Sequence, residues 1–294
     1  MLYQYTNGNA EITIYKDGTR IVECDGDLNL DYPLNIDIRV SEQCAFGLHK
    51  KTGTAICNFC HESATTDGAH GNLVDLIEVL KEIPPGIELA VGLNQINADV
   101  EQFLMDCHDH GWIVNTTINQ GHIPRDKDKI KTLLGMNLIH GLGISYRRGM
   151  KDIEPSILAY QNTVVHVIAG IDTIQEVKEL ASKGVKKILV LGEKDFGFNV
   201  GKVKLNTKNH IDWYRHVHEL FRLFDVVSFD NLALDQLNVR RFVLDWETMY
   251  QHEFSFYINA VQKYFAPSSR SDEKVWYNSG IGIKEYFAKI KGNK

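Results

Sequence analysis

The chain has 294 residues, of which 44% are hydrophobic and 24% are charged, and its formal net charge is −6. These values are ordinary for a folded protein with a sizeable core, and the length suits one large α/β domain or two small ones. The net negative charge does not indicate nucleic-acid binding, although the totals leave open a local basic patch. No run of 18 or more apolar residues predicts a membrane span, and residues 1–15 lack the pattern of a signal peptide.

The first 34 residues are expected to form an N-terminal extension. Residues 11–24 alternate between apolar and polar side chains around Lys16-Asp17-Gly18, which is typical of a β-hairpin. Residues 25–33 form a polar connector. Residues 35–40 are then predicted to be a strand, and this strand runs directly into a stretch that contains three cysteines.

From there the chain alternates between strand and helix patterns. Strands are predicted at residues 35–40, 87–91, 113–118, 139–146, 163–168 and 186–191, and helices at 73–83, 98–110, 126–134, 153–161, 173–182 and 211–224. Short β-branched strands that alternate with helices indicate a parallel sheet with right-handed crossovers. No G-x-G-x-x-G follows the first strand, so the pattern favours a partial (βα)6-type TIM-like barrel over an open doubly wound sheet.

The last seventy residues break this rhythm. Residues 226–230 could form a seventh strand, and the rest of the segment is aromatic-rich with a short closing helix at 283–290. No flexible linker precedes it. We therefore expect three parts, which are a hairpin extension (residues 1–34), a barrel (35–225) and a C-terminal cap packed on the barrel (226–294).

Three of the five cysteines lie within seventeen residues, as Cys44, Cys57 and Cys60 in a C-x12-C-x2-C pattern. An odd cysteine count without an export signal favours reduced thiols and a cytoplasmic location. Three thiolates can hold three irons of a [4Fe–4S] cluster and leave the fourth iron open. A structural zinc site needs four ligands, and His49 or His61 could supply the fourth.

This arrangement resembles the radical S-adenosylmethionine (SAM) enzymes, which carry a three-cysteine motif after the first strand of a partial or complete (βα) barrel. The usual spacing in that family is C-x3-C-x2-C, so the first gap is expanded here. The aromatic residue before the last cysteine, Phe59, is also typical of the family, in which it packs near the adenine of SAM.

The resemblance implies further SAM contacts at the ends of later strands. After the second strand, Gly92 matches a Gly-Gly-Glu-like segment, and Asn94 or Gln95 would supply its polar contact. After the fourth strand, Ser145 and Arg147 would meet the ribose or carboxylate of SAM. In the fifth strand, Ile168 and Gly170 match a G-x-I-x-G segment beside adenine. The resemblance assigns no catalytic residue.

By this resemblance the cofactors would be a [4Fe–4S] cluster and SAM, with a flavodoxin- or ferredoxin-like protein as one-electron donor. Reductive cleavage of SAM would yield a 5′-deoxyadenosyl radical that abstracts hydrogen from a substrate which the sequence does not identify. One alternative is a zinc-binding barrel protein whose metal serves structure or hydrolysis. Another is a binding or regulatory protein that keeps a cluster or metal for stability alone.

Overall fold

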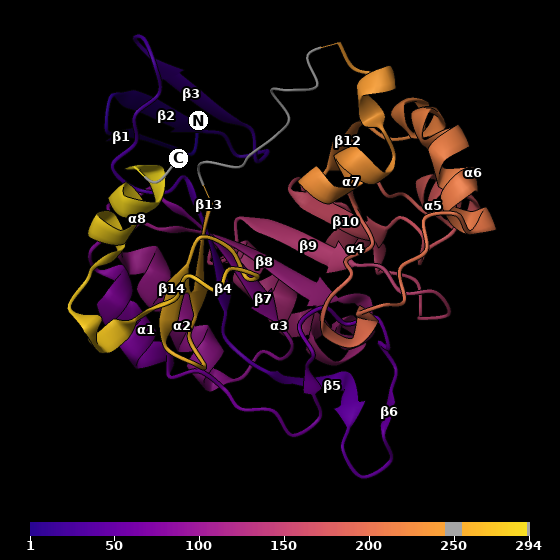
Figure 1. Ribbon diagram of the computed structural model, residues 1–294, viewed down its shortest axis with the longest axis horizontal. Coiled ribbons are helices and arrows are strands. Elements are labelled where there is room, and N and C mark those ends of the chain that lie inside the picture. Colours follow the sequence, from indigo (N-terminus) through magenta and orange to yellow (C-terminus); the bar gives the residue numbers. More distant parts are fainter. Residues whose placement is uncertain (245–254, 293–294) are drawn as a thin grey trace.

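The computed structural model describes residues 1–244 and 255–292. It is an α/β structure built on a ten-stranded, mostly parallel sheet in the order β12-β11-β10-β9-β8-β7-β4-β13-β14-β15 (Figure 1). The strands are β4 Asn35–Arg39, β7 Glu88–Leu93, β8 Ile113–Asn119, β9 Gly141–Ser145, β10 Thr163–Ile168, β11 Lys187–Leu191, β12 Val226–Phe229, β13 Ser255–Asn259, β14 Tyr264–Ala266 and β15 Val275–Trp276. The predicted α/β class and the parallel pairing are confirmed, and residues 226–229 are indeed a seventh strand of this series. The order leaves β12 and β15 as two edges, so the described sheet is not closed into a barrel.

Helical segments connect the parallel strands. They are α1 Leu73–Leu80, α2 Ala98–Asp109, η1 Gln120–His122, α3 Ile123–Gly135, α4 Pro155–Leu158, α5 Ile174–Ser182, η2 Gly197–Asn199, α6 Lys208–His216, η3 Val217–Arg222, α7 Asn231–Gln236 and η4 Val239–Arg241. Several begin at side-chain caps, such as Asn72 before α1, Asn97 before α2 and Thr173 before α5. These caps satisfy N–H groups that the first turn of a helix leaves free, and so they fix where each helix begins.

Two predicted helices differ from the structure. The helix expected at 211–224 is divided at His216 into α6 and the 3-10 helix η3, and the helix expected at 153–161 is reduced to the four residues of α4. Both differences concern length and ends, where local patterns carry the least information. No helix among residues 1–244 and 255–292 is long and apolar enough to cross a membrane.

The two faces of the parallel sheet have different side chains. In β4, Ile36 and Ile38 are buried in the main hydrophobic core, whereas Asp37 and Arg39 on the other face are exposed or half-buried. The same alternation recurs in β8 and β10, because successive side chains in a strand point to opposite faces. The sheet therefore has one apolar face covered by the helices and one face with polar, partly accessible side chains.

The N-terminal extension is a three-stranded antiparallel sheet of β1 Tyr3–Asn7, β2 Ala10–Ile14 and β3 Arg20–Cys24. The expected hairpin corresponds to β2 and β3, and β1 was not predicted. This small sheet contacts the amino ends of the parallel strands, where Arg20 Nη1 lies 2.6 Å from Glu88 Oε2 and Lys187 Nζ donates to the carbonyl of Asp17. It therefore covers the end of the large sheet that is opposite to the carboxyl ends.

The C-terminal segment contributes strands to the large sheet. Strand β13 pairs in parallel with β4, opposite β7, and β14 and β15 continue the sheet in antiparallel pairing before η6 Tyr277–Ser279 and α8 Ile283–Gly292. Phe256 and Ile258 of β13 are fully buried. The first strand of the βα series is therefore an internal strand of the sheet, with both neighbours in place.

Candidate functional site

The first two cysteines of the motif are brought together by a β-hairpin. Cys44 lies in β5 Gln43–His49, which pairs with β6 Thr54–Ala55. The chain then turns back, and the Cys57 N–H donates to the carbonyl of Phe46 at 3.0 Å. The long gap between the first and second cysteines is therefore occupied by the hairpin, and it does not separate them in space.

The three thiols share one environment. Burial raises the pKa of Cys44, and the neighbouring thiols Cys57 and Cys60 raise it further. Burial also raises the pKa of Cys60, with smaller contributions from Glu62 and Cys57. Even so, no group of three or more His, Cys, Asp or Glu side chains within the described ranges stands at metal-holding geometry.

The carboxyl ends of the parallel strands meet this hairpin. Asn119, the last residue of β8, places its Nδ2 3.8 Å from Cys57 Sγ, and His122 Nε2 lies 3.6 Å from Cys44 Sγ. Burial, aided by the charge of Arg125, lowers the pKa of His122 to about 4, so its imidazole is neutral at pH 7. Sequence reasoning missed His122, although its place just after the third predicted strand could have indicated it.

The two histidines considered as zinc ligands lie elsewhere. His49 is exposed at the end of β5, opposite Thr54. His61 Nε2 lies 3.2 Å from Glu62 Oε1, and its ring meets that of Phe196 edge-on at 5.5 Å between centroids. Neither histidine has a described contact with a cysteine thiol, and His122 is the one that does.

The three residues after the second predicted strand that were expected to contact SAM differ in their surroundings. Asn94 donates from Nδ2 to the carbonyl of Gln43 at 2.8 Å, so it holds the strand that carries Cys44. Gly92 is exposed on the polar face of β7, and a Cβ there would meet no atom within 4 Å. Gln95 Nε2 lies 3.2 Å from His70 Nε2, and no contact between Gln95 and a thiol is described.

Phe59 and Arg147, which were singled out separately in the sequence, come together. The Arg147 guanidinium carbon lies 4.8 Å from the centroid of the Phe59 ring, in cation–π geometry. Its Nη1 donates to the carbonyl of Tyr146, whereas its buried Nε has no partner among the described residues. Ser145 ends β9 between Asn119 and His166 in the register of the sheet. Arg147 therefore retains donor capacity beside the cysteine segment.

Ile168 and Gly170 lie at the carboxyl end of β10. The Ile168 N–H donates to Asp172 Oδ2 at 2.7 Å. Gly170 has a φ of +97°, and a Cβ at this position would lie 2.2 Å from His210 Cε1. Glycine is required here by both its backbone and the packing of His210, and this accounts for Gly170 without a ligand.

A buried acid–base pair beside Gly170 was not predicted. His210 Nε2 lies 2.8 Å from Glu193 Oε2, with side chains only 5% and 10% exposed. Asn199 donates to the other oxygen of Glu193 at 3.1 Å, and Gln236 holds the Glu193 backbone through two hydrogen bonds. His210 lies in α6, well after Glu193 in the chain, and no local sequence pattern links the two residues.

The polar face of the sheet also carries titratable side chains on β10 and β4. In β10, burial and then the charge of Arg147 lower the pKa of His166 to about 4, so this imidazole is neutral at pH 7. His166 packs over Gly143 of β9, where a Cβ would lie 2.5 Å from its ring. On β4, the exposed Asp37 accepts a hydrogen bond at Oδ1 from Asn35 Nδ2 at 3.2 Å.

Comparisons with known proteins add no family to this picture. No protein-family model matches the chain, and no curated protein matches it at a significant level.

Proposed function

We propose that the protein is a radical SAM enzyme that acts on an unidentified substrate. The observation that carries the proposal is the meeting of the three-cysteine hairpin with Arg147 at the carboxyl ends of consecutive parallel strands. In barrels of parallel strands, the chemistry sits at this end. As part of this proposal, strands β4 and β7–β12 curve into a partial (βα)6-type barrel. The proposal also places the protein in the cytoplasm.

The donor set suits an open cluster. Cys44, Cys57 and Cys60 would bind three irons through sulfur, and the site offers no fourth cysteine. Since the thiols do not stand at ligating geometry, binding would require the hairpin to draw its sulfur atoms together. Arg147 has an unpartnered buried Nε, which could bind the carboxylate of SAM. When bound, the cluster and SAM would supply a one-electron cleavage that yields a radical for hydrogen abstraction.

The residues of the chain itself would bind SAM, orient it and shield it from water. Asn94 fixes the cysteine strand through the Gln43 carbonyl, and Phe59 would cover one side of SAM while Arg147 orients its carboxylate. His122 and His166 are neutral at pH 7, so they would place no cation beside the thiolates or on the sheet face. The electron would come from a flavodoxin- or ferredoxin-like donor.

The test is anaerobic purification and reconstitution, followed by iron and sulfide analysis and EPR of the reduced protein with and without SAM. We expect about four irons per chain and a spectrum that shifts when SAM is added. Cys57→Ser should lose the cluster, whereas Cys24→Ser should keep it, because Cys24 is exposed in the N-terminal sheet and its thiol donates to the carbonyl of Gly26. A cluster that SAM does not perturb would contradict the enzyme proposal.

A zinc site is the second candidate, and the contact between His122 and Cys44 favours it. Three cysteines and one histidine can fill all four coordination positions of a structural zinc ion. Metal analysis showing one zinc and no sulfide, with zinc lost in His122→Ala, would establish this site. Iron and sulfide that persist in His122→Ala would eliminate it.

A further inference from the structure

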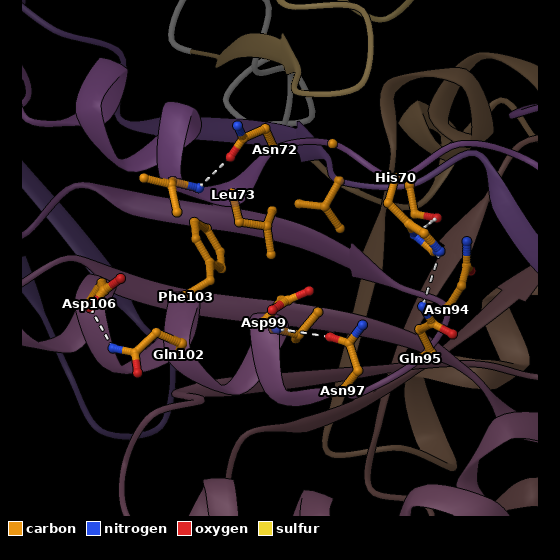
Figure 2. Close-up of a pocket in the computed structure, with 15 residues that line it drawn as sticks. His70, Asn72, Leu73, Asn94, Gln95, Asn97, Asp99, Gln102, Phe103 and Asp106 are labelled. Atoms are coloured by element: carbon orange, nitrogen blue, oxygen red, sulfur yellow. Dashed lines mark hydrogen bonds between the residues drawn. The ribbon is translucent and has the colours of Figure 1, made fainter.

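A cavity of about 330 Å³ lies between α1 and α2, outside the polar face of the sheet (Figure 2). It opens beside the carboxyl ends of β4 and β7, and neither Phe59 nor any of the three motif cysteines lines it. We call it the α1–α2 cavity. Its lining residues are Val40, Ser41, His70–Val74, Asn94, Gln95, Asn97, Asp99, Val100, Gln102, Phe103 and Asp106.

The α1–α2 cavity has an apolar floor, and polar side chains stand along its length. Figure 2 shows Phe103 between Asp106 at one end and His70 with Gln95 at the other. Phe103 and Val100 are buried residues of α2, and they form a fixed apolar floor together with Val40. His70 is held by contacts with Ser41 Oγ at 3.0 Å and Gln43 Oε1 at 2.8 Å. An apolar floor with separated polar groups along it suits an elongated ligand.

The charges of the lining select against anions. Both α1 and α2 begin at the cavity, and free N–H groups at a helix start attract anions. Here, however, Asn72 accepts from Val74 N and Asp75 N, and Asn97 accepts from Val100 N, so these donors are already occupied. None of the lining residues is lysine or arginine.

The two carboxylates of the lining both come from α2. Asp106 accepts a hydrogen bond from Gln102, whereas no partner is described for the Asp99 side chain. The two positions are two helical turns apart, which corresponds to about 10 Å along the helix axis. Both therefore lie on the same side of α2, next to the apolar floor formed by Val100 and Phe103.

We propose that the α1–α2 cavity binds an aliphatic di- or polyamine. Its protonated ends would meet Asp99 and Asp106, its methylene chain would cover Phe103, and the side-chain amides would accept its remaining N–H groups. This site is separate from the proposed SAM chemistry. Failure of either proposal leaves the other intact, because amine binding can be measured on protein that holds no cluster.

The test is isothermal titration calorimetry with spermidine and 1,8-diaminooctane, and with 1,8-octanediol as the uncharged analogue. We expect saturable binding of one amine per chain and no binding of the diol. Asp99→Asn and Asp106→Asn should each weaken binding about three- to fivefold, and the double variant about tenfold or more, because partly exposed ion pairs are individually modest.

Asp109→Asn is the matched control, since it makes the same change of charge at the end of α2 outside the cavity, where Asp109 is exposed. It should bind the amines as the parent does. Binding that survives in the double variant, that falls equally in Asp109→Asn, or that the diol reproduces would overturn the proposal. Absence of any saturable amine binding would do the same. Circular dichroism checks that each variant is folded.

Discussion

Arg147 and Arg148 are neighbours in the chain, but only Arg147 is placed to bind a ligand. Arg147 stacks on Phe59 with a buried, unpartnered Nε, whereas the Arg148 side chain is 78% exposed and pairs with Glu176 at 2.8 Å. We expect Arg147→Gln to weaken SAM binding about tenfold, the effect of one charged hydrogen bond. Equilibrium dialysis of SAM against the reconstituted protein measures this, and Arg148→Gln is the control. Equal losses in both variants would contradict the assignment.

Asp172 should make stability depend on pH. Burial raises its pKa from 3.8 to about 6, although the Ile168 N–H donates to it. Because the folded chain holds this proton more tightly than the unfolded chain, the carboxyl favours folding below about pH 4. This contribution is lost as the pH rises through about 6. Relative to the parent, Asp172→Asn should therefore gain about 2–3 kcal/mol of unfolding free energy between pH 4 and pH 7.

Urea unfolding at several pH values measures this difference. His122 and His166 titrate in both proteins, so the comparison between variant and parent isolates Asp172. The exposed Asp128→Asn serves as a control that should follow the parent at every pH. Parallel stability curves for Asp172→Asn and the parent would show that burial of this carboxyl has no energetic effect.

Single residues also show how far the sequence predicts the candidate site. Phe59 and Arg147 could be singled out because each follows a recognisable local pattern, and the structure places them in contact. His122 could have been noticed from its place just after the third predicted strand, whereas no local pattern pointed to the pair of Glu193 and His210, because no spacing rule connects them. The SAM contacts assigned from the sequence all remain predictions, namely those of Phe59, Gly92, Asn94, Ser145, Arg147, Ile168 and Gly170.

Among the elements, the contact between β3 and β7 attaches the N-terminal sheet to the large one. Arg20 and Glu88 are 18% and 10% exposed, and Asn115 donates to the second oxygen of Glu88. Arg20→Met would leave a mostly buried carboxylate without its cation, so we expect a loss of about 2–3 kcal/mol in urea unfolding. Lys50→Met, which removes one side of the exposed pair with Asp67, should cost less than about 0.5 kcal/mol. Similar losses in the two variants would refute this account.

The elements that the sequence predicted well are those with strong local periodicity. The six strands of the βα series follow from buried β-branched runs, and α2, which was predicted at residues 98–110, spans Ala98–Asp109. Strand β5 was missed because its partner β6 has only two residues, and the position of β13 was missed because parallel pairing leaves no mark in nearby sequence. Pairing between distant segments is fixed by packing of the whole sheet.

At the scale of the molecule, β13 completes the sheet around β4. A chain that ends at residue 254 would leave the β4 edge unpaired and remove the buried Phe256 and Ile258. We expect it to lose cooperative unfolding and to bind a hydrophobic dye. The full-length Ile258→Ala variant should unfold cooperatively, with a loss of about 3 kcal/mol. A shortened chain that still unfolds in one sharp transition would show that β13 is dispensable.

The pairing of β4 with β13 also has a consequence during protein synthesis. Asn35 leaves the ribosome more than two hundred residues before its partner Ser255 is made. At translation rates of roughly 5–20 residues per second, β13 is synthesised on the order of ten to forty seconds after β4. During this time the nascent chain would carry an incomplete apolar strand next to its cysteine hairpin. We therefore expect its yield in cells to depend on chaperones that bind emerging chains.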